Sequence, residues 1–373
     1  MSSGIYLHVP FCKSRCSYCD FATDVYRNAE VVEQYVDILC TEIGNFRSEI
    51  SVDADTIYFG GGTPSLLQSK QVESILEAVH TKFNIATDPE VTIEMNPATV
   101  TPETLAEYRR LGINRASFGV QTFDDRALKL LARGHNANDA RNTFAMLREV
   151  GFNNISFDLI AGLPGQTLAD WKANLDEAIQ LSPEHISLYL LEVHSGTPLA
   201  EQIYSGRQPI PDDDLAGEMY ELMLDRLAAA RYEQYEISNF SKPGFRSRHN
   251  TKYWRLEPVF GFGVSAHSFD GRERYANDRD TAKYVEMIKR GETAEVMREK
   301  ADKVSETAFL GLRMEEGIDL AKYKTTFDVD LLTEHKDEVS HLIDAGLIEL
   351  AEGCMHLTRR GKLLSNEVFA VFV

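Results

Sequence analysis

The sequence has no long apolar run and no leader-like N-terminus. Hydrophobic residues make up 43% of the 373 residues, yet no stretch approaches the ~18 consecutive apolar residues that a membrane helix needs. The N-terminus also lacks a basic segment followed by an apolar one, which a secretory signal would have. We therefore expect a cytoplasmic protein without a transmembrane segment, for which any membrane contact is peripheral.

The chain also has no excess of positively charged residues. The chain has 39 Lys and Arg against 58 Asp and Glu, which gives a formal net charge of −19 and a pI near 5.0. Phosphate backbones select proteins with a surplus of Lys and Arg. The charge balance therefore argues against nucleic acid as a partner.

Cysteines are few and odd in number, which makes a disulfide framework improbable in a chain without a secretion signal. Cys12, Cys16 and Cys19 are spaced C-x3-C-x2-C, whereas Cys40 and Cys354 stand alone. Because unpaired cysteine is among the most buried residue types, we expect the two isolated ones to be buried as small apolar residues. The three clustered cysteines favour a metal site, because clustered thiols in a reducing compartment more often bind metal.

The absence of a fourth clustered cysteine favours an iron–sulfur cluster over a structural zinc site. Structural zinc takes four ligands, commonly from two C-x2-C pairs, and no second pair exists here. Three thiolates can instead hold three irons of a cubane 4Fe-4S cluster and leave the fourth iron open. A structural zinc site or a redox-active loop is the alternative. The loop resembles the signature of the radical S-adenosylmethionine (SAM) superfamily, in which the methionine end of SAM chelates the open iron.

Six short β-rich runs alternate with helical stretches. This pattern predicts parallel strands joined by right-handed crossovers, and hence an α/β fold of the partial (β/α)6 TIM-like barrel type. The cysteine loop would follow the first strand, at the carboxyl end where barrel sites lie. The expected strands are at 4–9, 55–60, 90–95, 115–120, 155–160 and 185–191.

Near residue 300 the pattern changes. A helix ending near Gly346, a strand, a turn at Gly353, a second strand and a final helix form the order of a winged-helix-like domain. Without a basic stripe, we expect this domain to pack or to bind a partner protein, not DNA. The predicted divisions are a core barrel at 1–225, a connecting region at 226–299 and the small C-terminal domain at 300–373.

Polar residues and glycines recur where the predicted strands end. The second strand runs into GGGTPS at 60–65, whose glycines allow close backbone approach to a ligand. Glu94 ends the third strand and suits ribose hydroxyls as an acceptor. Gln121 follows the fourth strand, the fifth strand carries Asp158, and Arg133 in between is suited to pair with a carboxylate. Each alone is weak evidence, but their recurrence predicts one ligand site.

Together these motifs resemble one family closely. The segments IYLHVPFCKSRCSYCDF, FGGGTPS, EMNP, SFGVQTF, LARGH, DLIAGLPGQT, YEISNF and GVSAHSF are similar to those of the oxygen-independent coproporphyrinogen III oxidases and their homologues, over nearly the whole chain. The resemblance implies a 4Fe-4S cluster on the three clustered cysteines. It also implies SAM contacts by Tyr6, Tyr18, Gly61, Gly62, Thr63, Glu94, Gln121, Arg133 and Asp158.

The sequence departs from the oxidases themselves at two points. Phe21 stands where the oxidase loop has a further cysteine, and only eleven residues precede Cys12, fewer than the segment expected to cover the oxidase substrate. In addition, RHNTKYW at 248–254 resembles the HNxxYW motif of the heme chaperone branch of the family. That branch has heme as an additional cofactor or cargo.

The resemblance implies heme contacts by His249, Asn250, Tyr253 and Trp254, with Arg248 as a partner for a propionate. Imidazole is a common axial ligand of heme iron, and the two aromatic rings offer flat surfaces to a porphyrin. The alternative is that His249 and Asn250 hold a loop while the aromatic side chains fill core. Four other histidines compete as ligands, namely His8, His135, His194 and His267.

Three functions follow, in order of preference. The first is a heme chaperone that delivers heme to respiratory membrane enzymes. The second is an oxidase that uses a SAM-derived radical to decarboxylate coproporphyrinogen III to protoporphyrinogen IX, and the third is a non-catalytic cluster or zinc scaffold. The first implies heme-accepting respiratory enzymes as partners, and heme donors such as bacterioferritin and a homodimer are compatible with it. Whether the protein is an enzyme is left open.

Overall fold

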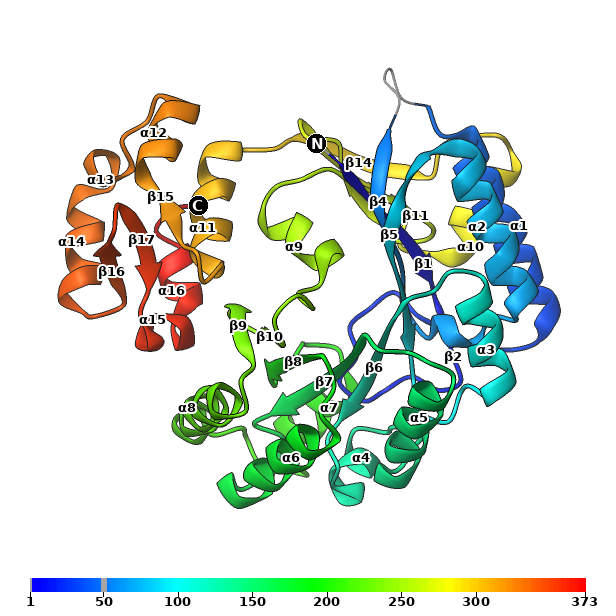
Figure 1. The fold of residues 1–373 in the computed structure, drawn as a ribbon, viewed down its shortest axis with the longest axis horizontal. Helices are drawn as coiled ribbons and strands as arrows, with labels where there is room; N and C mark the ends of the chain where they lie inside the picture. The colour runs from blue at the N-terminus through cyan, green and yellow to red at the C-terminus, as the bar shows by residue number, and fades with distance from the viewer. Residues whose placement is uncertain (1, 48–51) are drawn as a thin grey trace.

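A curved, mostly parallel sheet forms the centre of the protein (Figure 1). The computed structural model describes residues 2–47 and 52–373, and within them one sheet has twelve strands. Its six central strands pair in parallel and in chain order. The predicted partial barrel is thereby confirmed. These strands are β1 (Ser3–Val9), β4 (Asp53–Gly61), β5 (Asn84–Met95), β6 (Arg115–Gln121), β7 (Ile155–Ala161) and β8 (His185–Leu190).

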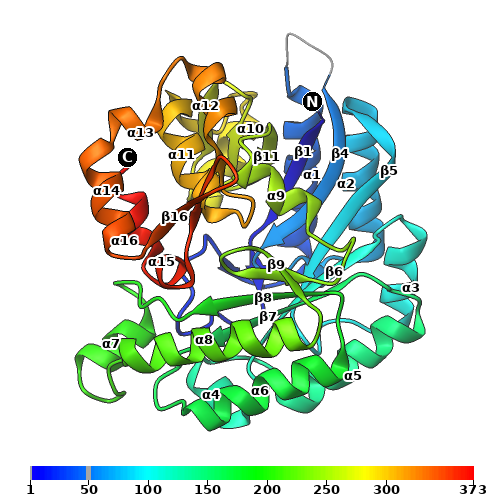
Figure 2. The ribbon, with the colours of Figure 1, turned by 60° about the vertical axis from the view of Figure 1, so that its left-hand side comes forward.

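Helices cover the convex face of this sheet (Figure 2). Alternate strand residues such as Ile5, Ile57 and Phe157 are fully buried in the main core. Local signals set the helix ends, because the Thr101 side chain accepts from the Thr104 N–H at the start of α3 and Gly112 follows it with φ of 95°. These helices are α1 (Ala29–Asn45), α2 (Ser69–Lys82), α3 (Pro102–Arg110), α4 (Asp125–Leu130), α5 (Ala137–Glu149), α6 (Leu168–Leu181) and α8 (Asp213–Ala229). Helix α7 (Pro198–Tyr204) instead contacts the cysteine loop, where the Leu199 N–H donates to the Ser17 carbonyl at 2.8 Å.

Short strands extend the sheet at both edges. Strands β10 (Asn239–Ser241) and β9 (Glu233–Glu236) add antiparallel to β8. At the other edge β11 (Val259–Phe262) pairs in parallel with β1, followed by antiparallel β12 (His267–Phe269), β13 (Glu273–Asn277) and β14 (Glu295–Lys300). Helix α10 (Thr281–Lys289) joins the last two and lies beside α1. The region 226–299 therefore adds strands to both edges of the barrel sheet.

Helix α9 (Arg248–Trp254) contacts the concave side of the sheet, against β1 and β4 (Figure 1). Its N-cap Ser247 is fully buried, and the Ser247 side chain accepts from the Asn250 N–H. The carboxylate of Glu90 on β5 accepts from the backbone N–H groups of Arg248 and His249 at 3.1 and 3.0 Å. An anion at the first turn satisfies unpaired donors and complements the helix dipole. Helix α9 is therefore anchored inside the barrel.

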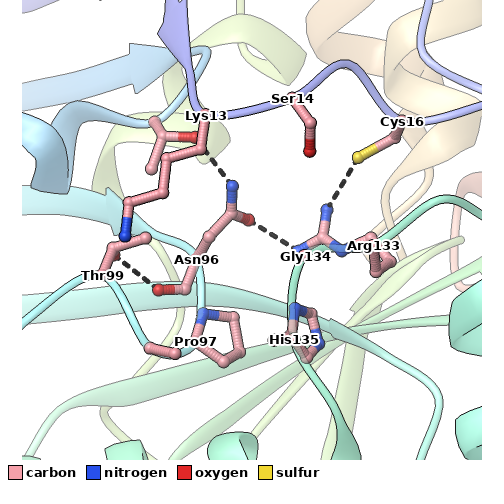
Figure 3. A pocket seen from close by; sticks show the side chains of 11 residues that line it. Lys13, Ser14, Cys16, Asn96, Pro97, Thr99, Arg133, Gly134 and His135 are labelled. Carbon is pink, nitrogen blue, oxygen red and sulfur yellow. Dashed lines mark hydrogen bonds between the residues drawn. The ribbon is translucent and has the colours of Figure 1, made fainter. Parts of the chain in front are cut away.

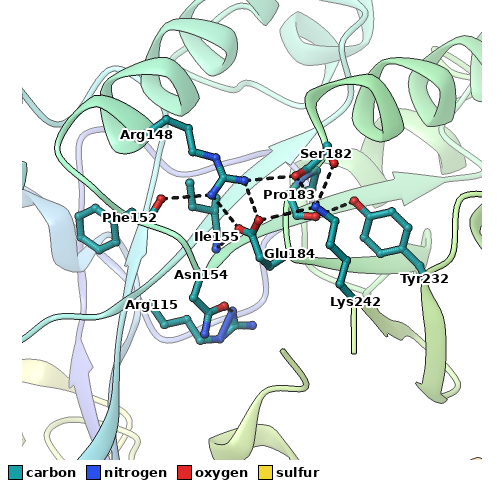
Figure 4. Close-up of polar contacts among 10 residues, drawn as sticks. All are labelled: Arg115, Arg148, Phe152, Asn154, Ile155, Ser182, Pro183, Glu184, Tyr232 and Lys242. Atoms are coloured by element: carbon teal, nitrogen blue, oxygen red, sulfur yellow. Dashed lines mark hydrogen bonds and ion pairs between the residues drawn. The ribbon is translucent and has the colours of Figure 1, made fainter. Parts of the chain in front are cut away.

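The amino ends of β7 and β8 are tied by one buried carboxylate (Figure 4). Glu184 accepts two hydrogen bonds from Arg148 of α5, at 2.8 and 2.9 Å, and one from the Ile155 N–H at 3.1 Å. Lys242 after β10 donates to the Ser182 carbonyl at 2.9 Å. A bidentate pair with additional donors is the arrangement in which a partly buried ion pair is satisfied.

The C-terminal part has its own apolar core, which includes Leu312, Tyr323, Ile348 and Met355. The hairpin of β16 (Ile348–Ala351) and β17 (Cys354–Leu357) follows α14 (Lys336–Asp344), as the winged-helix-like pattern predicts. The structure adds a third strand, β15 (Ile318–Asp319), and divides the final helix into α15 (Arg359–Leu363) and α16 (Ser365–Phe369). The remaining helices are α11 (Lys303–Arg313), α12 (Leu320–Phe327) and α13 (Leu331–Glu334). The domain boundaries at 225 and 299 stay a prediction.

Across the described ranges, no helix combines the length and the apolarity that spanning a bilayer requires.

Candidate functional site

The cysteine loop is closed at its base by a pair of two-residue strands. Strand β2 (Phe11–Cys12) pairs in parallel with β3 (Asp24–Val25), and the Tyr26 N–H donates to the Cys12 carbonyl at 2.7 Å. Farther along the loop, the backbone N–H and the hydroxyl of Ser17 donate to the carbonyls of Leu131 and Leu130, each at 3.0 Å. The loop is thus fixed both at its ends and in its middle, beyond the carboxyl ends of the barrel strands.

Cys12, Cys16 and Cys19 are free thiols and only partly exposed. The Thr63 hydroxyl lies 3.5 Å from the Cys12 sulfur, and an Arg133 nitrogen lies 3.4 Å from the Cys16 sulfur. Burial raises the pKa of the Cys12 and Cys19 thiols. Within residues 2–47 and 52–373, no three His, Cys, Asp or Glu side chains converge as ligands of a single metal ion. A cubane distributes its three thiolates over three irons, so it does not require such convergence.

Arg133 connects the cysteine loop to the strand ends (Figure 3). Besides Cys16, its guanidinium donates to the Asn96 side-chain oxygen at 2.6 Å and to the Gly119 carbonyl at 2.7 Å. Asn96 in turn donates to Thr63 at 2.7 Å. These contacts join the loop, the turn after β5 and the end of β6 around one pocket. Sequence reasoning missed Asn96, although it stands in the quoted EMNP segment.

The three-glycine turn at the end of β4 lies directly against the chain that enters the cysteine loop. The Gly62 N–H donates to the Val9 carbonyl at 2.8 Å, and the Thr63 N–H donates to the Phe11 carbonyl at 2.8 Å. A Cβ on Gly62 would meet the Pro10 carbonyl oxygen at 2.6 Å, which is closer than real Cβ contacts. Only glycine therefore permits this approach of the two backbones.

Glu94 ends β5 beside this turn and is partly buried. Its carboxylate accepts from the Tyr58 hydroxyl at 2.7 Å and from the Gly61 N–H at 3.1 Å. Burial, with a further contribution from the charge of Asp158, raises the pKa of Glu94 to about 7. Burial also raises the pKa of Asp158 on β7. The barrel thus holds two carboxyl groups that are costly to ionise without a cation or additional donors.

The other predicted cofactor residues lie around the same region. The Tyr6 hydroxyl lies 3.2 Å from a ring nitrogen of His8, whose other nitrogen faces the Ala22 carbonyl at 2.9 Å. Gln121 has a φ of 65°, an uncommon value for a non-glycine residue that often marks functional sites. Tyr18 packs on an apolar cluster of Leu131, Leu163 and Leu199, among others.

Of the predicted heme residues of α9, His249 lies inside the barrel, next to Tyr58 and Tyr6. His249 is 1% exposed, and its two ring nitrogens face the hydroxyls of Thr56 at 2.8 Å and Tyr253 at 3.1 Å. Burial lowers the pKa of His249 to about 3, so the imidazole is neutral. In this arrangement both nitrogens that could bind iron are engaged.

The remaining residues of this segment have partners too. Arg248 forms an ion pair with Asp55 at 3.1 Å, so it does not stand free for a propionate. The Arg313 guanidinium lies 4.2 Å from the ring centre of Trp254. Asn250, Tyr253 and Trp254 keep part of their surfaces exposed.

Comparisons with known proteins identify the family of this chain. The family model of the Radical SAM superfamily matches residues 6–178, which contain the cysteine loop and the glycine turn. That of the HemN C-terminal domain matches residues 299–364. The solved structure of the Escherichia coli coproporphyrinogen III oxidase (HemN), described as a radical SAM enzyme, has the same fold, with a TM-score of 0.87 over 100% of this chain and 90% of that chain at 22% identity. The fold and the site define a member of the radical SAM superfamily.

Curated relatives narrow the assignment. The chain is 36% identical to the heme chaperone HemW of Bacillus subtilis over 99% of its length and 98% of the relative. It is 31% identical to HemW of Escherichia coli, over 99% of this chain and 98% of that protein. It is also 34% identical to the mitochondrial radical S-adenosyl methionine domain-containing protein 1 of Mus musculus, over 99% and 85%. The chain belongs to the HemW heme chaperone family.

Proposed function

We propose that this protein is a heme chaperone that holds a 4Fe-4S cluster and SAM in its barrel and binds heme for delivery to respiratory enzymes. The observation that carries the proposal is the position of α9. The helix with the heme motif contacts the inner wall of the barrel, where the His249 ring stacks on Tyr58 and the Tyr58 hydroxyl bonds to Glu94. The predicted heme residue His249 and the predicted SAM residue Glu94 are therefore linked through one side chain, Tyr58.

The residues present fit a cluster with SAM. Three free thiols stand on one fixed loop, and the neighbouring glycine turn packs directly against the chain that enters this loop. Cys12, Cys16 and Cys19 would hold the cluster, which supplies redox chemistry when it is bound. Glu94 would accept hydrogen bonds from SAM, and Arg133 would exchange part of its present contacts for the SAM carboxylate. Tyr6, Tyr18, Gly61, Gly62, Thr63, Gln121 and Asp158 complete the proposed SAM site.

For heme, we propose His249 as the iron ligand and the rings of Tyr253 and Trp254 as the surfaces that contact the porphyrin. Ligation requires His249 to leave Thr56 or Tyr253, because each ring nitrogen faces one of these hydroxyls. A buried neutral imidazole is well suited to metal binding once it is released, since no proton has to leave first. Exposure of α9 is thus the step that would control heme binding and release.

Heme-accepting respiratory enzymes are the proposed partners. The oxidase reading is less favoured, since Phe21 occupies the position of the oxidase's additional cysteine. The Phe21 side chain is 69% exposed beside the loop, and it cannot ligate metal.

Two parallel assays on anaerobically reconstituted protein test the proposal. Heme titration is expected to give a saturable Soret band. Incubation with coproporphyrinogen III, beside an active oxidase as control, is expected to leave the substrate unchanged. Formation of protoporphyrinogen IX would replace the proposal with the oxidase function, and failure to bind heme would reject it.

A further inference from the structure

A second, larger cavity lies apart from all the residues assigned above. Its volume is about 620 Å³, within the usual range for small-molecule sites. It is bounded by the last turn of α1, by β11 and β13, and by the segment from the end of α10 into β14. Helices α1 and α10 lie side by side there (Figure 1), and their aromatic residues Tyr35 and Tyr284 are in contact.

One wall of this cavity is aromatic. Phe46 and Phe262 line it, with ring centres 5.5 Å apart. Phe46 also contacts Phe83 and Phe260, at 5.3 and 5.2 Å, so it is supported from behind. Phe46 remains partly exposed although it closes a helix inside a folded domain. Phe262 is only 3% exposed, so the apolar surface that this wall offers is mainly that of Phe46, which the neighbouring phenylalanine rings hold in place.

A negatively charged side chain, Glu42, also lines the cavity. Its carboxylate accepts from the Gly263 N–H at 2.7 Å, from the Asn277 side chain at 2.6 Å and from the Tyr284 hydroxyl at 2.7 Å. All three donors are neutral, and among the described residues no Lys, Arg or His pairs with it. Burial raises the pKa of Glu42, because the three hydrogen bonds only partly replace water.

The remaining charges around the cavity leave it negative. Arg298 is neutralised by Glu295 and Glu273 and lies over the Tyr275 ring at 4.3 Å. Arg47 donates to the Phe46 carbonyl at the rim, and Glu292 adds a further carboxylate. The carboxyl ends of α1 and α10 also converge here, where Lys82 already donates to the Gly44 carbonyl at 3.3 Å and Lys289 stands in the last turn of α10, so the cavity's negative charge rests on its carboxylates.

From these contacts we propose that the cavity is a binding site for an organic cation with a flat apolar body, such as an arylalkyl amine. The ammonium group pairs with Glu42, and the apolar body lies against Phe46 and Phe262. A cation near an aromatic face gains further attraction from the ring quadrupole. This site is independent of the proposed heme chaperone function.

Fluorine NMR on the full chain tests the site with three probes of one shape: 4-fluorobenzylamine, 4-fluorobenzyl alcohol and 4-fluorobenzoate. We expect the amine to bind about tenfold more tightly than the alcohol, and the benzoate to bind more weakly than either. In Glu42→Gln the preference for the amine over the alcohol should disappear. Glu286→Gln, which removes a charge from the exposed face of α10, should leave it unchanged.

A second variant covers the case in which Glu42→Gln does not fold. Thr293 is exposed at the cavity lining, so Thr293→Trp fills the space without changing charge and should abolish binding of all three probes. The proposal is overturned if no probe binds, if benzoate binds as tightly as the amine, or if binding survives Thr293→Trp. Retention of the amine preference in a folded Glu42→Gln protein would also overturn it.

Discussion

The imidazole of His249 stacks on the phenol ring of Tyr58, with ring centres 5.0 Å apart and planes inclined by 26°. The Tyr58 hydroxyl donates to Glu94, the carboxylate nearest the glycine turn. A change at α9 therefore reaches the proposed SAM site through a single side chain. This relationship underlies the first two predictions.

Thr56 and His249 should affect heme binding in opposite directions. Thr56→Val keeps the side-chain shape but frees one nitrogen of His249, and the net value of a typical hydrogen bond is about 1 kcal/mol. Heme affinity should therefore rise about fivefold in Thr56→Val and fall in His249→Ala. Soret titration measures both, with Thr81→Val on the exposed face of α2 as the matched control. Equal affinities in all four proteins would remove His249 as the ligand and leave it a structural residue.

Glu94 should make both folding stability and SAM binding depend on pH. Its pKa is about 7 in the fold and lower in the unfolded chain, so the native state binds more protons between pH 5 and 7. Stability therefore falls as pH rises through this window, and Glu94→Gln should flatten the dependence in denaturant titrations at pH 5 and 8. SAM binding requires the carboxylate, so calorimetry should show it weakening below pH 7 in the native protein. An unchanged pH profile of stability in the variant would contradict this account.

Gly62 and its control Gly44 test the close approach of the glycine turn to the chain that enters the cysteine loop. A Cβ at position 62 would meet backbone atoms at 2.6 to 2.8 Å, whereas a Cβ at Gly44 in α1 meets nothing within 4 Å. Gly62→Ala should cost about 1–3 kcal/mol of folding free energy and lower the iron content after reconstitution. Gly44→Ala should instead stabilise the protein by about 0.5–1 kcal/mol. Full iron loading in Gly62→Ala would show that the turn does not support the cysteine loop.

Most of the central strands could be predicted from the sequence because they contain compact apolar runs buried on both faces, as in IYLHV or ISFDLI. The edge strands could not be predicted from the sequence. Strands β9, β12 and β13 are three to five residues long and partly polar, and they exist because an edge of the sheet was available for pairing. Nothing in their own sequence signals this.

The same distinction applies to the site. The cysteine spacing and the glycine run are motifs of consecutive residues, so the cysteine loop and the glycine turn could be predicted from the sequence. By contrast, Asn96 and Tyr58 owe their positions to tertiary contacts with Arg133 and Glu94. The sequence of α9 marks His249 as chemically interesting, but it cannot tell which face of the helix meets β4.

The cluster is the central claim, and iron and sulfide analysis with Mössbauer spectroscopy on anaerobically reconstituted protein tests it most directly. About four irons per chain in a 4Fe-4S cluster are expected, with the cluster destabilised in Cys12→Ala, Cys16→Ala and Cys19→Ala. Cys40→Ala should load normally, because Cys40 lies on α1 packed against the main core. A single zinc ion or no iron in the native chain, or an equal loss in Cys40→Ala, would contradict the account.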